Sequence, residues 1–171
     1  MPTDPANIKL IVLDVDGVLT DGTINLDDAS NEIKRFNIRD GFGIRMWQAF
    51  GGQVAICTGR TGIAVTRRAR ELGIEHVIQG ASDKAAAMAD LAETTGVPTA
   101  QMAFIGDDWP DLPAMRAVGL SFAVADAEEL VKEHAGRTTE RRGGRGAVRE
   151  VVELLLEARG ELEQAKQRYL S

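Results

Sequence analysis

The sequence is poor in the residues that build disulfides and zinc sites. Its single cysteine, Cys57, has no partner for an internal disulfide, and the two histidines, His76 and His134, are isolated from each other. These counts exclude a disulfide scaffold and a zinc cluster of cysteines and histidines. Cys57 lies in an apolar run, where we expect a buried and inert thiol.

The sequence also lacks a long apolar run and a marked positive charge. No stretch is long enough to cross a bilayer, and the first residues lack the basic and then apolar pattern of a signal peptide. We therefore expect a cytoplasmic protein with no membrane partner. The formal net charge of −6 disfavours nonspecific binding to nucleic acid. Because such a surface repels phosphorylated metabolites, an anionic substrate requires a locally basic pocket.

The residues that are present predict one domain over 1–171. Short apolar runs alternate with helical patterns, which is typical of an α/β fold of the Rossmann-like kind. We expect a parallel sheet with helices on both faces and no large cap domain. The expected strands span 8–13, 53–57, 76–79, 102–105 and 120–124, and the expected helices span 62–72, 84–95, 112–118 and 128–135.

Two segments depart from this alternation. Short extended pieces flank a turn-rich stretch and predict a small protruding β-hairpin over about 23–38. The tail, about 137–171, begins with a basic, glycine-rich stretch that carries five arginines from Arg137 to Arg149. That stretch is either a flexible connection or a lid that reaches a neighbouring site. On the lid interpretation, removing the residues after Arg142 impairs turnover but leaves the fold intact.

Two carboxylates follow the first expected strand, at the edge where a parallel sheet binds its ligands. Asp14 and Asp16 repel each other, and a bound cation relieves that repulsion. Mg²⁺ fits such a pair together with phosphate and water oxygens. Asp14 can attack phosphorus, while Asp16 can protonate the leaving oxygen and then activate water. Taken alone, the motif is also consistent with a solvated acidic loop.

The ends of the next strands carry a hydroxyl and positive charge. Thr58 and the free N–H groups around Gly59 suit a phosphate oxygen, and the planar fork of Arg60 suits a substrate carboxylate. Lys84 lies in the first turn of a helix, where it opposes the helix dipole. Its unfavourable position indicates a charged partner, although surface lysines are common.

A second carboxylate cluster follows the strand at 102–105. Asp107 can complete a metal shell, and Asp108 or Asp111 can orient it or hold Lys84; Asp111 also suits a helix N-cap. Together the four groups meet the needs of phosphoryl transfer, an in-line nucleophile and neutralised equatorial oxygens. We therefore predict a Mg²⁺-dependent phosphatase. Its predicted catalytic residues are Asp14, Asp16, Thr58 and Lys84.

These groups resemble, in order, the four motifs of the haloacid dehalogenase superfamily of phosphatases, over nearly the whole chain. The matching residues are Asp14-Val15-Asp16-Gly17, Thr58, Lys84 and Gly106-Asp107-Asp108. The acid at position 16 argues against the dehalogenase branch, and the short hairpin resembles the branch with the smallest caps. Further stretches are similar to the family of 3-deoxy-D-manno-octulosonate 8-phosphate (KDO 8-phosphate) phosphatases of lipopolysaccharide synthesis: 36–44, 71–74, 79–80 and 143–150.

The resemblance implies a site and an assembly. Magnesium would be held by the side chains of Asp14 and Asp107 and by the backbone carbonyl of Asp16. The substrate would be a small anionic sugar phosphate, and the chain would form a homotetramer whose hairpins and tails contact neighbouring active sites. The implied substrate contacts are Asp16, Asn37, Ile38, Arg39, Asp40, Gly41, Arg45, Gly59, Arg60, Arg68 and Lys84. Without the resemblance, Arg45 and Arg68 are better explained as a solvated helix face.

Other interpretations stay open. A phosphatase for a nine-carbon, sialic-acid-type 9-phosphate has a substrate with a similar carboxylate and a distal phosphate. A receiver-like phosphoacceptor domain also clusters aspartates, a threonine and a lysine at strand ends, but there the lysine comes last and no acid is expected at position 16. A catalytically silent oligomerisation module is disfavoured because every motif residue is retained.

Overall fold

A parallel sheet forms the centre of the protein. The computed structural model describes residues 3–29 and 31–170. Its strands are β1 (Leu10–Leu13), β2 (Gln53–Thr58), β3 (His76–Gln79), β4 (Met102–Gly106), β5 (Leu120–Ala123) and β6 (Arg137–Thr138). They lie in the order β3-β2-β1-β4-β5-β6, and all neighbouring pairs are parallel. The predicted α/β fold is therefore confirmed, and the described residues contain no large cap domain.

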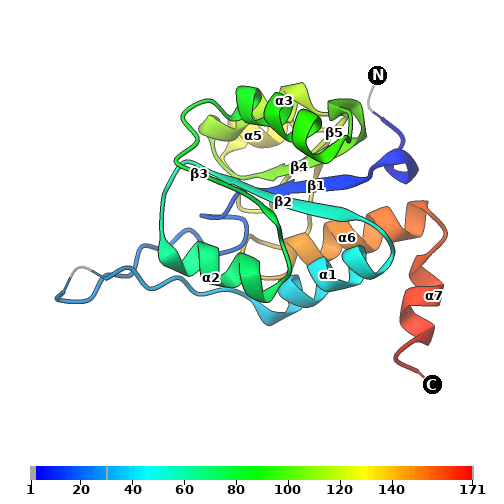
Figure 1. The fold of residues 1–171 in the computed structure, drawn as a ribbon, viewed down its shortest axis with the longest axis horizontal. Helices are drawn as coiled ribbons and strands as arrows, with labels where there is room; N and C mark the ends of the chain where they lie inside the picture. The colour runs from blue at the N-terminus through cyan, green and yellow to red at the C-terminus, as the bar shows by residue number, and fades with distance from the viewer. Residues whose placement is uncertain (1–2, 30, 171) are drawn as a thin grey trace.

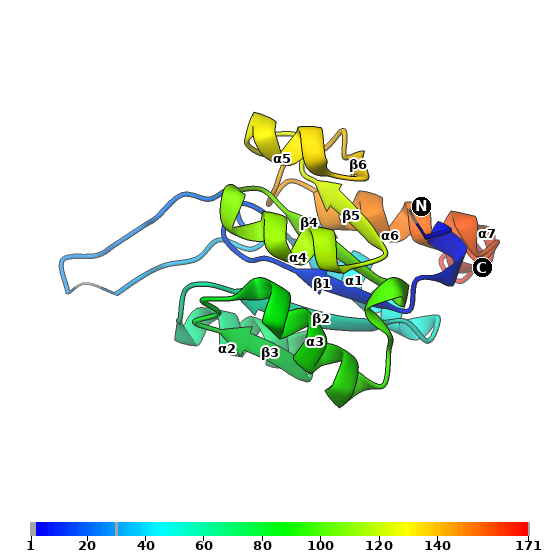
Figure 2. The same ribbon diagram turned by 90° about the horizontal axis from the view of Figure 1, so that it is seen from above.

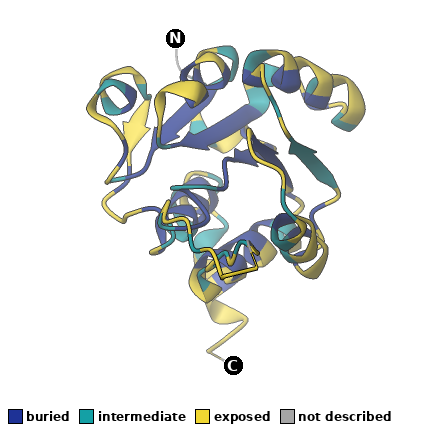
Figure 3. Cartoon of the chain, turned by 90° about the vertical axis from the view of Figure 1, so that its left-hand side faces the viewer, coloured by how far each residue is buried: buried dark blue, intermediate teal, exposed yellow. Residues whose placement is uncertain are grey.

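Helices cover both faces of the sheet (Figures 1 and 2). One face carries α1 (Ile38–Ala49), α2 (Ile63–Glu71) and α6 (Ala147–Ala158), and the other carries α3 (Lys84–Thr95), α4 (Leu112–Ala117) and α5 (Glu129–His134). α7 (Leu162–Gln167) follows α6, and 3₁₀ helices form at Pro5–Asn7, Thr99–Gln101 and Trp109–Asp111. Cover on both faces explains why β1 is an unbroken apolar run whose residues are all buried (Figure 3).

The structure bears on two expectations from composition. Cys57 is fully buried, and that burial raises the pKa of its thiol to about 11, which makes it inert. Over the residues that the structure describes, no helix has the length and apolar composition needed to cross a membrane.

The order of the strands creates a crevice. From β1 the chain extends the sheet through β2 and β3 on one side, and it later returns to build β4, β5 and β6 on the other side. The carboxyl ends of β2, β1 and β4 therefore lie side by side, with β1 in the middle. A reversal of this kind opens a crevice beyond the strand ends, and the residues that follow these three strands surround it.

The segment 23–36, which we call the arm, projects from this end of the sheet (Figure 1). Leu26 and Glu32 form an isolated antiparallel bridge. The predicted hairpin at 23–38 is thus present in outline, but its described residues form no regular strand, and its C-terminal end already belongs to α1. Pairing stays short because no third strand supports the arm.

The C-terminal tail is part of the folded body. It begins with β6 at the edge of the sheet, and α6 then packs against α1 (Figure 1). The expectation that the fold survives removal of the residues after Arg142 is wrong, because the removal takes an apolar helix face out of the core. The buried residues of that face include Val148, Val151, Val152, Leu155 and Leu156.

We predict that Leu155→Ala lowers the free energy of unfolding by about 2–5 kcal/mol, because the side chain is fully buried and its loss leaves a cavity. Urea denaturation measures the change. The matched control is Leu154→Ala on the same helix, where the side chain is only partly buried and the expected loss is about 1 kcal/mol. Equal losses in the two variants would contradict the packing of α6.

Candidate active site

The residues that follow β1, β2 and β4 and those that begin α3 enclose a cavity of about 790 Å³. The first loop is fixed to the sheet, since the Asp14 amide donates to the Ile105 carbonyl at 3.1 Å. The cavity therefore gathers side chains that lie far apart in the sequence. Its lining includes Asp14, Asp16, Thr58, Gly59, Arg60, Lys84, Asp107, Asp108 and Asp111.

A buried ion triad lies at the floor of the cavity. Lys84 Nζ is 2.8 Å from Asp14 Oδ1 and 2.5 Å from Asp111 Oδ1, and all three side chains are less than a tenth exposed. Asp83 caps α3 by accepting from two backbone amides, which sets Lys84 at the first helical position. Burial favours the neutral amine, but the two carboxylates raise the pKa of Lys84 above its usual value. The position of Lys84 in the helix indicated a charged partner, and the structure provides two, Asp14 and Asp111.

The Asp107 carboxylate is open to a ligand. Asp111 Oδ2 accepts from the Asp107 amide at 2.9 Å, so Asp111 positions that residue through its backbone. Over residues 3–29 and 31–170, no hydrogen-bond donor or cationic side chain contacts the Asp107 carboxylate. One carboxylate oxygen from each of Asp14, Asp107 and Asp111 lies within 4.8 Å of the other two. Gly17 leaves the space for it: its φ is +88°, and a Cβ there would lie 1.9 Å from Asp107 Oδ2.

The acidic cluster holds more negative charge than Lys84 balances. Burial, followed by Asp111 and Asp14, raises the pKa of Asp107 to about 8. Burial and then Asp111 raise the pKa of Asp14 to about 6, although Lys84 acts in the opposite direction. A divalent cation among these oxygens would relieve the repulsion. Hard carboxylate oxygens beside an open crevice fit Mg²⁺.

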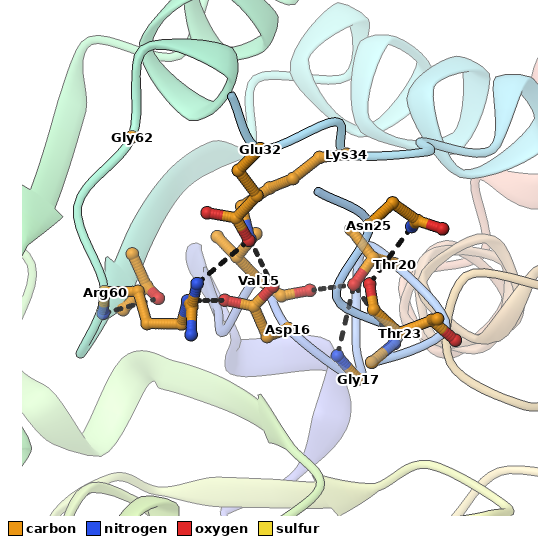
Figure 4. A network of polar contacts seen from close by, with 12 residues as sticks. Val15, Asp16, Gly17, Thr20, Thr23, Asn25, Glu32, Lys34, Arg60 and Gly62 are labelled. Atoms are coloured by element: carbon orange, nitrogen blue, oxygen red, sulfur yellow. Dashed lines mark hydrogen bonds and ion pairs between the residues drawn. The ribbon is translucent and has the colours of Figure 1, made fainter. Parts of the chain in front are cut away.

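The loop that carries Asp14 and Asp16 is organised by a buried hydroxyl (Figure 4). Thr20 Oγ1 accepts from the amides of Gly17 at 3.3 Å and Gly22 at 3.2 Å, and it donates to the Val15 carbonyl at 3.4 Å. The hydroxyl thus joins both ends of a tight turn, and it holds the turn without using the carboxylate of Asp14 or Asp16.

The glycine-rich part of the tail supports the same loop from outside. The Gly144 amide donates to the Val18 carbonyl at 2.8 Å, and a Cβ at Gly143 would lie 1.6 Å from the Gly17 carbonyl oxygen. The Gly143 amide is itself held by Asp126 at 2.9 Å. The stretch is therefore an ordered backing for the loop that carries Asp14 and Asp16, and not a flexible connection, while its role as a lid on a neighbouring copy stays a prediction.

The base of the arm adds two residues that the sequence reasoning missed (Figure 4). Lys34 Nζ bonds Asp16 Oδ1 and lies 2.9 Å from Glu32 Oε1. Arg60 Nη2 lies 3.1 Å from the same Glu32 oxygen, and Arg60 Nε lies 3.7 Å from Asp16 Oδ2. Glu32 and Lys34 are two residues apart in an extended segment, so they face the same side, whereas Ile33 is exposed. That alternation is the signal that would have found them.

The start of α1, which the resemblance assigned to the substrate, does not line the cavity. Asn37 caps α1, and its side chain donates to the Gly144 carbonyl at 3.0 Å. Asp40 is buried and accepts from the amides of Gly146 at 3.1 Å and Arg149 at 3.0 Å. Both side chains therefore hold the tail in place. The other residues of this stretch are the exposed Ile38 and Arg39 and the buried Gly41.

Two of the arginines also lie away from the cavity. Arg45 donates to the Leu72 carbonyl at 3.3 Å and lines a separate pocket at the starts of β2 and β3. It lies about two helical turns beyond the start of α1, roughly 10 Å further along the helix axis. Arg68 pairs with Glu71 at 2.9 Å and packs over the Gly41 backbone. Of the arginines proposed for the substrate, Arg60 lines the cavity and these two do not.

Comparisons with known proteins agree with this geometry. A family model described as haloacid dehalogenase-like hydrolase matches residues 73–151. The 3-deoxy-D-manno-octulosonate 8-phosphate phosphatase KdsC of Salmonella typhi is 49% identical over 164 residues, which cover 96% of this chain and 87% of that protein.

Two solved structures extend the likeness. The 3-deoxy-D-manno-octulosonate 8-phosphate phosphatase of Yersinia pestis has a TM-score of 0.92 and 48% identity, over 94% of this chain and 86% of that one. The enzyme of the same name from Moraxella catarrhalis, in complex with a magnesium ion, a phosphate ion and KDO, has a TM-score of 0.94 and 40% identity. That match covers 97% of this chain and 95% of the other.

We predict that Lys84→Met lowers the free energy of unfolding by about 3–5 kcal/mol in the presence of a chelator, because Asp14 and Asp111 lose their buried cation. Urea denaturation in excess EDTA measures the loss. The control is Lys132→Met, whose ammonium lies 3.6 Å from Glu129 near the surface and whose loss should cost at most about 1 kcal/mol. A similar small effect at both positions would show that the triad is not a structural element.

Proposed function

Because this chain belongs to the family of 3-deoxy-D-manno-octulosonate 8-phosphate phosphatases, within the haloacid dehalogenase-like hydrolases, we propose that its cavity removes the phosphate of that sugar acid. The chain is a phosphoric monoester hydrolase, and Mg²⁺ is its cofactor. The observation that carries the proposal is the meeting of Asp14, Asp16, Thr58, Lys84 and Asp107 around one cavity.

We assign the metal site to the carboxylates of Asp14 and Asp107 and the backbone carbonyl of Asp16. The open Asp107 carboxylate and the excess negative charge of the cluster support this choice. Asp111 supports the site by holding the Asp107 amide and Lys84, and Asp108 caps the turn that follows. When bound, Mg²⁺ neutralises charge on the phosphate oxygens and draws them toward the nucleophile.

Three side chains of this protein then have separate roles in the reaction. Lys84 holds Asp14 Oδ1, which leaves Asp14 Oδ2 to attack phosphorus. As that bond forms, the bond from phosphorus to the sugar oxygen breaks, and Asp16 gives its proton to the leaving oxygen. Asp16 next takes a proton from water, which attacks the aspartyl phosphate, frees inorganic phosphate and restores Asp14.

Binding of the substrate follows from the rest of the lining. The Thr58 hydroxyl and the amides near Gly59 hold phosphate oxygens, and Lys84 offsets their charge. Arg60 is half-exposed at the rim, where its guanidinium pairs with the substrate carboxylate. A phosphate at one end and a carboxylate at the other thus fix the sugar acid in one direction.

We further propose a cytoplasmic homotetramer that acts in lipopolysaccharide sugar synthesis. The arm supports an assembly, because it leaves Ile24, Leu26 and Ile33 more than half exposed. The exposed Ile38 and Arg39 at the start of α1 then contact the substrate of a neighbouring copy, since they do not line the cavity of their own chain.

We predict that Asp14→Asn reduces Mg²⁺-dependent phosphate release from the eight-carbon substrate by at least about 10³-fold, because the amide cannot form the aspartyl phosphate. Phosphate release and circular dichroism measure activity and folding together. Asp90→Asn, on the exposed face of α3, is the control and should leave both unchanged. A variant at position 14 with wild-type turnover would remove the nucleophile from this scheme.

A comparison of substrates tests the rest of the proposal. We expect a higher kcat/KM for the eight-carbon 8-phosphate than for a sialic-acid-type 9-phosphate, and no release of phosphate from either without Mg²⁺. The opposite preference would make the nine-carbon sugar the substrate. A phosphoenzyme that persists without turnover would instead indicate a phosphoacceptor domain.

We also predict that Mg²⁺ binds more tightly as the pH rises from about 6 to about 8. Burial raises the pKa of Asp107 to about 8, so below that pH the carboxyl carries a proton that the cation must displace. One displaced proton corresponds to about a tenfold change in Kd per pH unit. Calorimetry in two buffers of different ionisation enthalpy measures affinity and proton release, and an affinity that is independent of pH would contradict the assignment.

A further inference from the structure

Four charges of alternating sign form a closed ring at the mouth of the cavity (Figure 4). Going round the ring, Lys34 contacts Asp16 and Glu32, and Arg60 contacts Glu32 and Asp16. Two members come from the arm and two from the cavity lining. The ring has no net charge, and each carboxylate has two cationic neighbours.

Glu32 already occupies part of the Arg60 guanidinium, the group with which a ligand carboxylate would pair. Its Oε1 lies 3.1 Å from Arg60 Nη2, and among the described residues Arg60 is the one arginine that lines the cavity. The Arg60 side chain is 47% exposed, so a ligand can reach it, whereas the Lys34 side chain is only 4% exposed. Lys34 therefore holds Glu32 beside Arg60 from the buried side.

We propose that Glu32 is an internal competitor for Arg60 that determines how tightly the site holds a sugar acid. In the empty site Glu32 neutralises the guanidinium. The substrate carboxylate replaces it, and after hydrolysis Glu32 returns and displaces the product. This inference rests on the proposed function, because it requires that the substrate carboxylate pairs with Arg60.

Competition from Glu32 weakens the binding of the product more than the binding of the substrate. The substrate is held by both its phosphate and its carboxylate, while the product has lost the phosphate and retains the carboxylate alone. A side chain on the same chain acts at an effective concentration of about millimolar, which is enough to compete with a ligand held by one weak contact. Glu32 thus favours release of the sugar acid without preventing entry of its phosphate ester.

The ring can open at Glu32 while both contacts of Asp16 stay in place. Glu32 Oε1 contacts both Lys34 and Arg60, so the two contacts of Glu32 loosen together, whereas Lys34 and Arg60 remain beside Asp16. The arm backbone next to Glu32 is held by a hydrogen bond from the Ile33 amide to the Asn25 carbonyl at 2.9 Å. The exchange therefore requires a rotation of the Glu32 side chain and no movement of the arm backbone.

The test is Glu32→Gln, which keeps the shape of the side chain and removes its charge. We expect the inhibition constant of the free eight-carbon sugar acid to fall about two- to fivefold, the range that a partly exposed ion pair gives. The KM for p-nitrophenyl phosphate, which has no carboxylate, should change by a smaller factor. Asp28→Asn makes the same charge change at an exposed position in the turn of the same arm and should leave both constants unchanged.

A double-mutant cycle with Arg60→Ala tests whether Glu32 changes sugar acid binding through Arg60. If Glu32 acts through Arg60, the tighter binding of the sugar acid disappears when Glu32→Gln is added to Arg60→Ala. Calorimetric titration of the sugar acid measures all four proteins without relying on turnover.

The inference fails if Glu32→Gln leaves sugar acid binding unchanged or weakens it. It also fails if Asp28→Asn gives the same gain, if p-nitrophenyl phosphate gains equally, or if the gain persists without Arg60. Failure of the proposed function is a separate result: the wild-type protein would then turn over p-nitrophenyl phosphate but not the sugar acid phosphate.

Discussion

The buried triad of Asp14, Lys84 and Asp111 is the interaction on which the rest of the site depends. It ties together the end of β1, the start of α3 and the turn after β4, so the three loops cannot move independently. One lysine offsets one of two carboxylates, and Asp107 adds a further negative charge nearby. A buried site with such an excess needs a cation to complete it, because unpaired charge is costly away from water. The fold thus holds the carboxylates of the metal site in position without the metal.

Much of the fold follows from local patterns. The strand at His76–Gln79 and the helix at Lys84–Thr95 were predicted with the bounds that the structure has, because a short β-branched run and an aspartate N-cap leave few alternatives. The meeting of the motif residues at one rim follows from a rule of topology, since the carboxyl ends of parallel strands share an edge. The position of Lys84 indicated a charged partner for a different reason, because a lysine in the first turn of a helix opposes the helix dipole. The catalytic roles of these residues stay predictions.

Other features depend on contacts between distant segments, which local patterns do not encode. Glu32 and Lys34 sit in an arm without a regular strand, so nothing in the alternation of strands and helices placed them over the cavity. Arg45 is carried away from the crevice by the rise of α1. The glycine-rich stretch that contains residues 143 and 144 was interpreted from composition as either a flexible connection or a lid. Their small size instead permits a close approach between two backbones.

The support that Gly144 gives to Val18 has a consequence for biosynthesis. The loop that carries Asp14 and Asp16 is synthesised long before its backing at Gly144, and β1 pairs with β4, which also follows much later in the chain. Contacts so distant in sequence form late, since the intervening chain must first be ordered. A nascent polypeptide on the ribosome therefore carries Asp14 and Asp16 in an unsupported loop until Gly144 has been synthesised. Chains that stop short of Gly144 would lack this support and expose unpaired segments to aggregation and proteolysis.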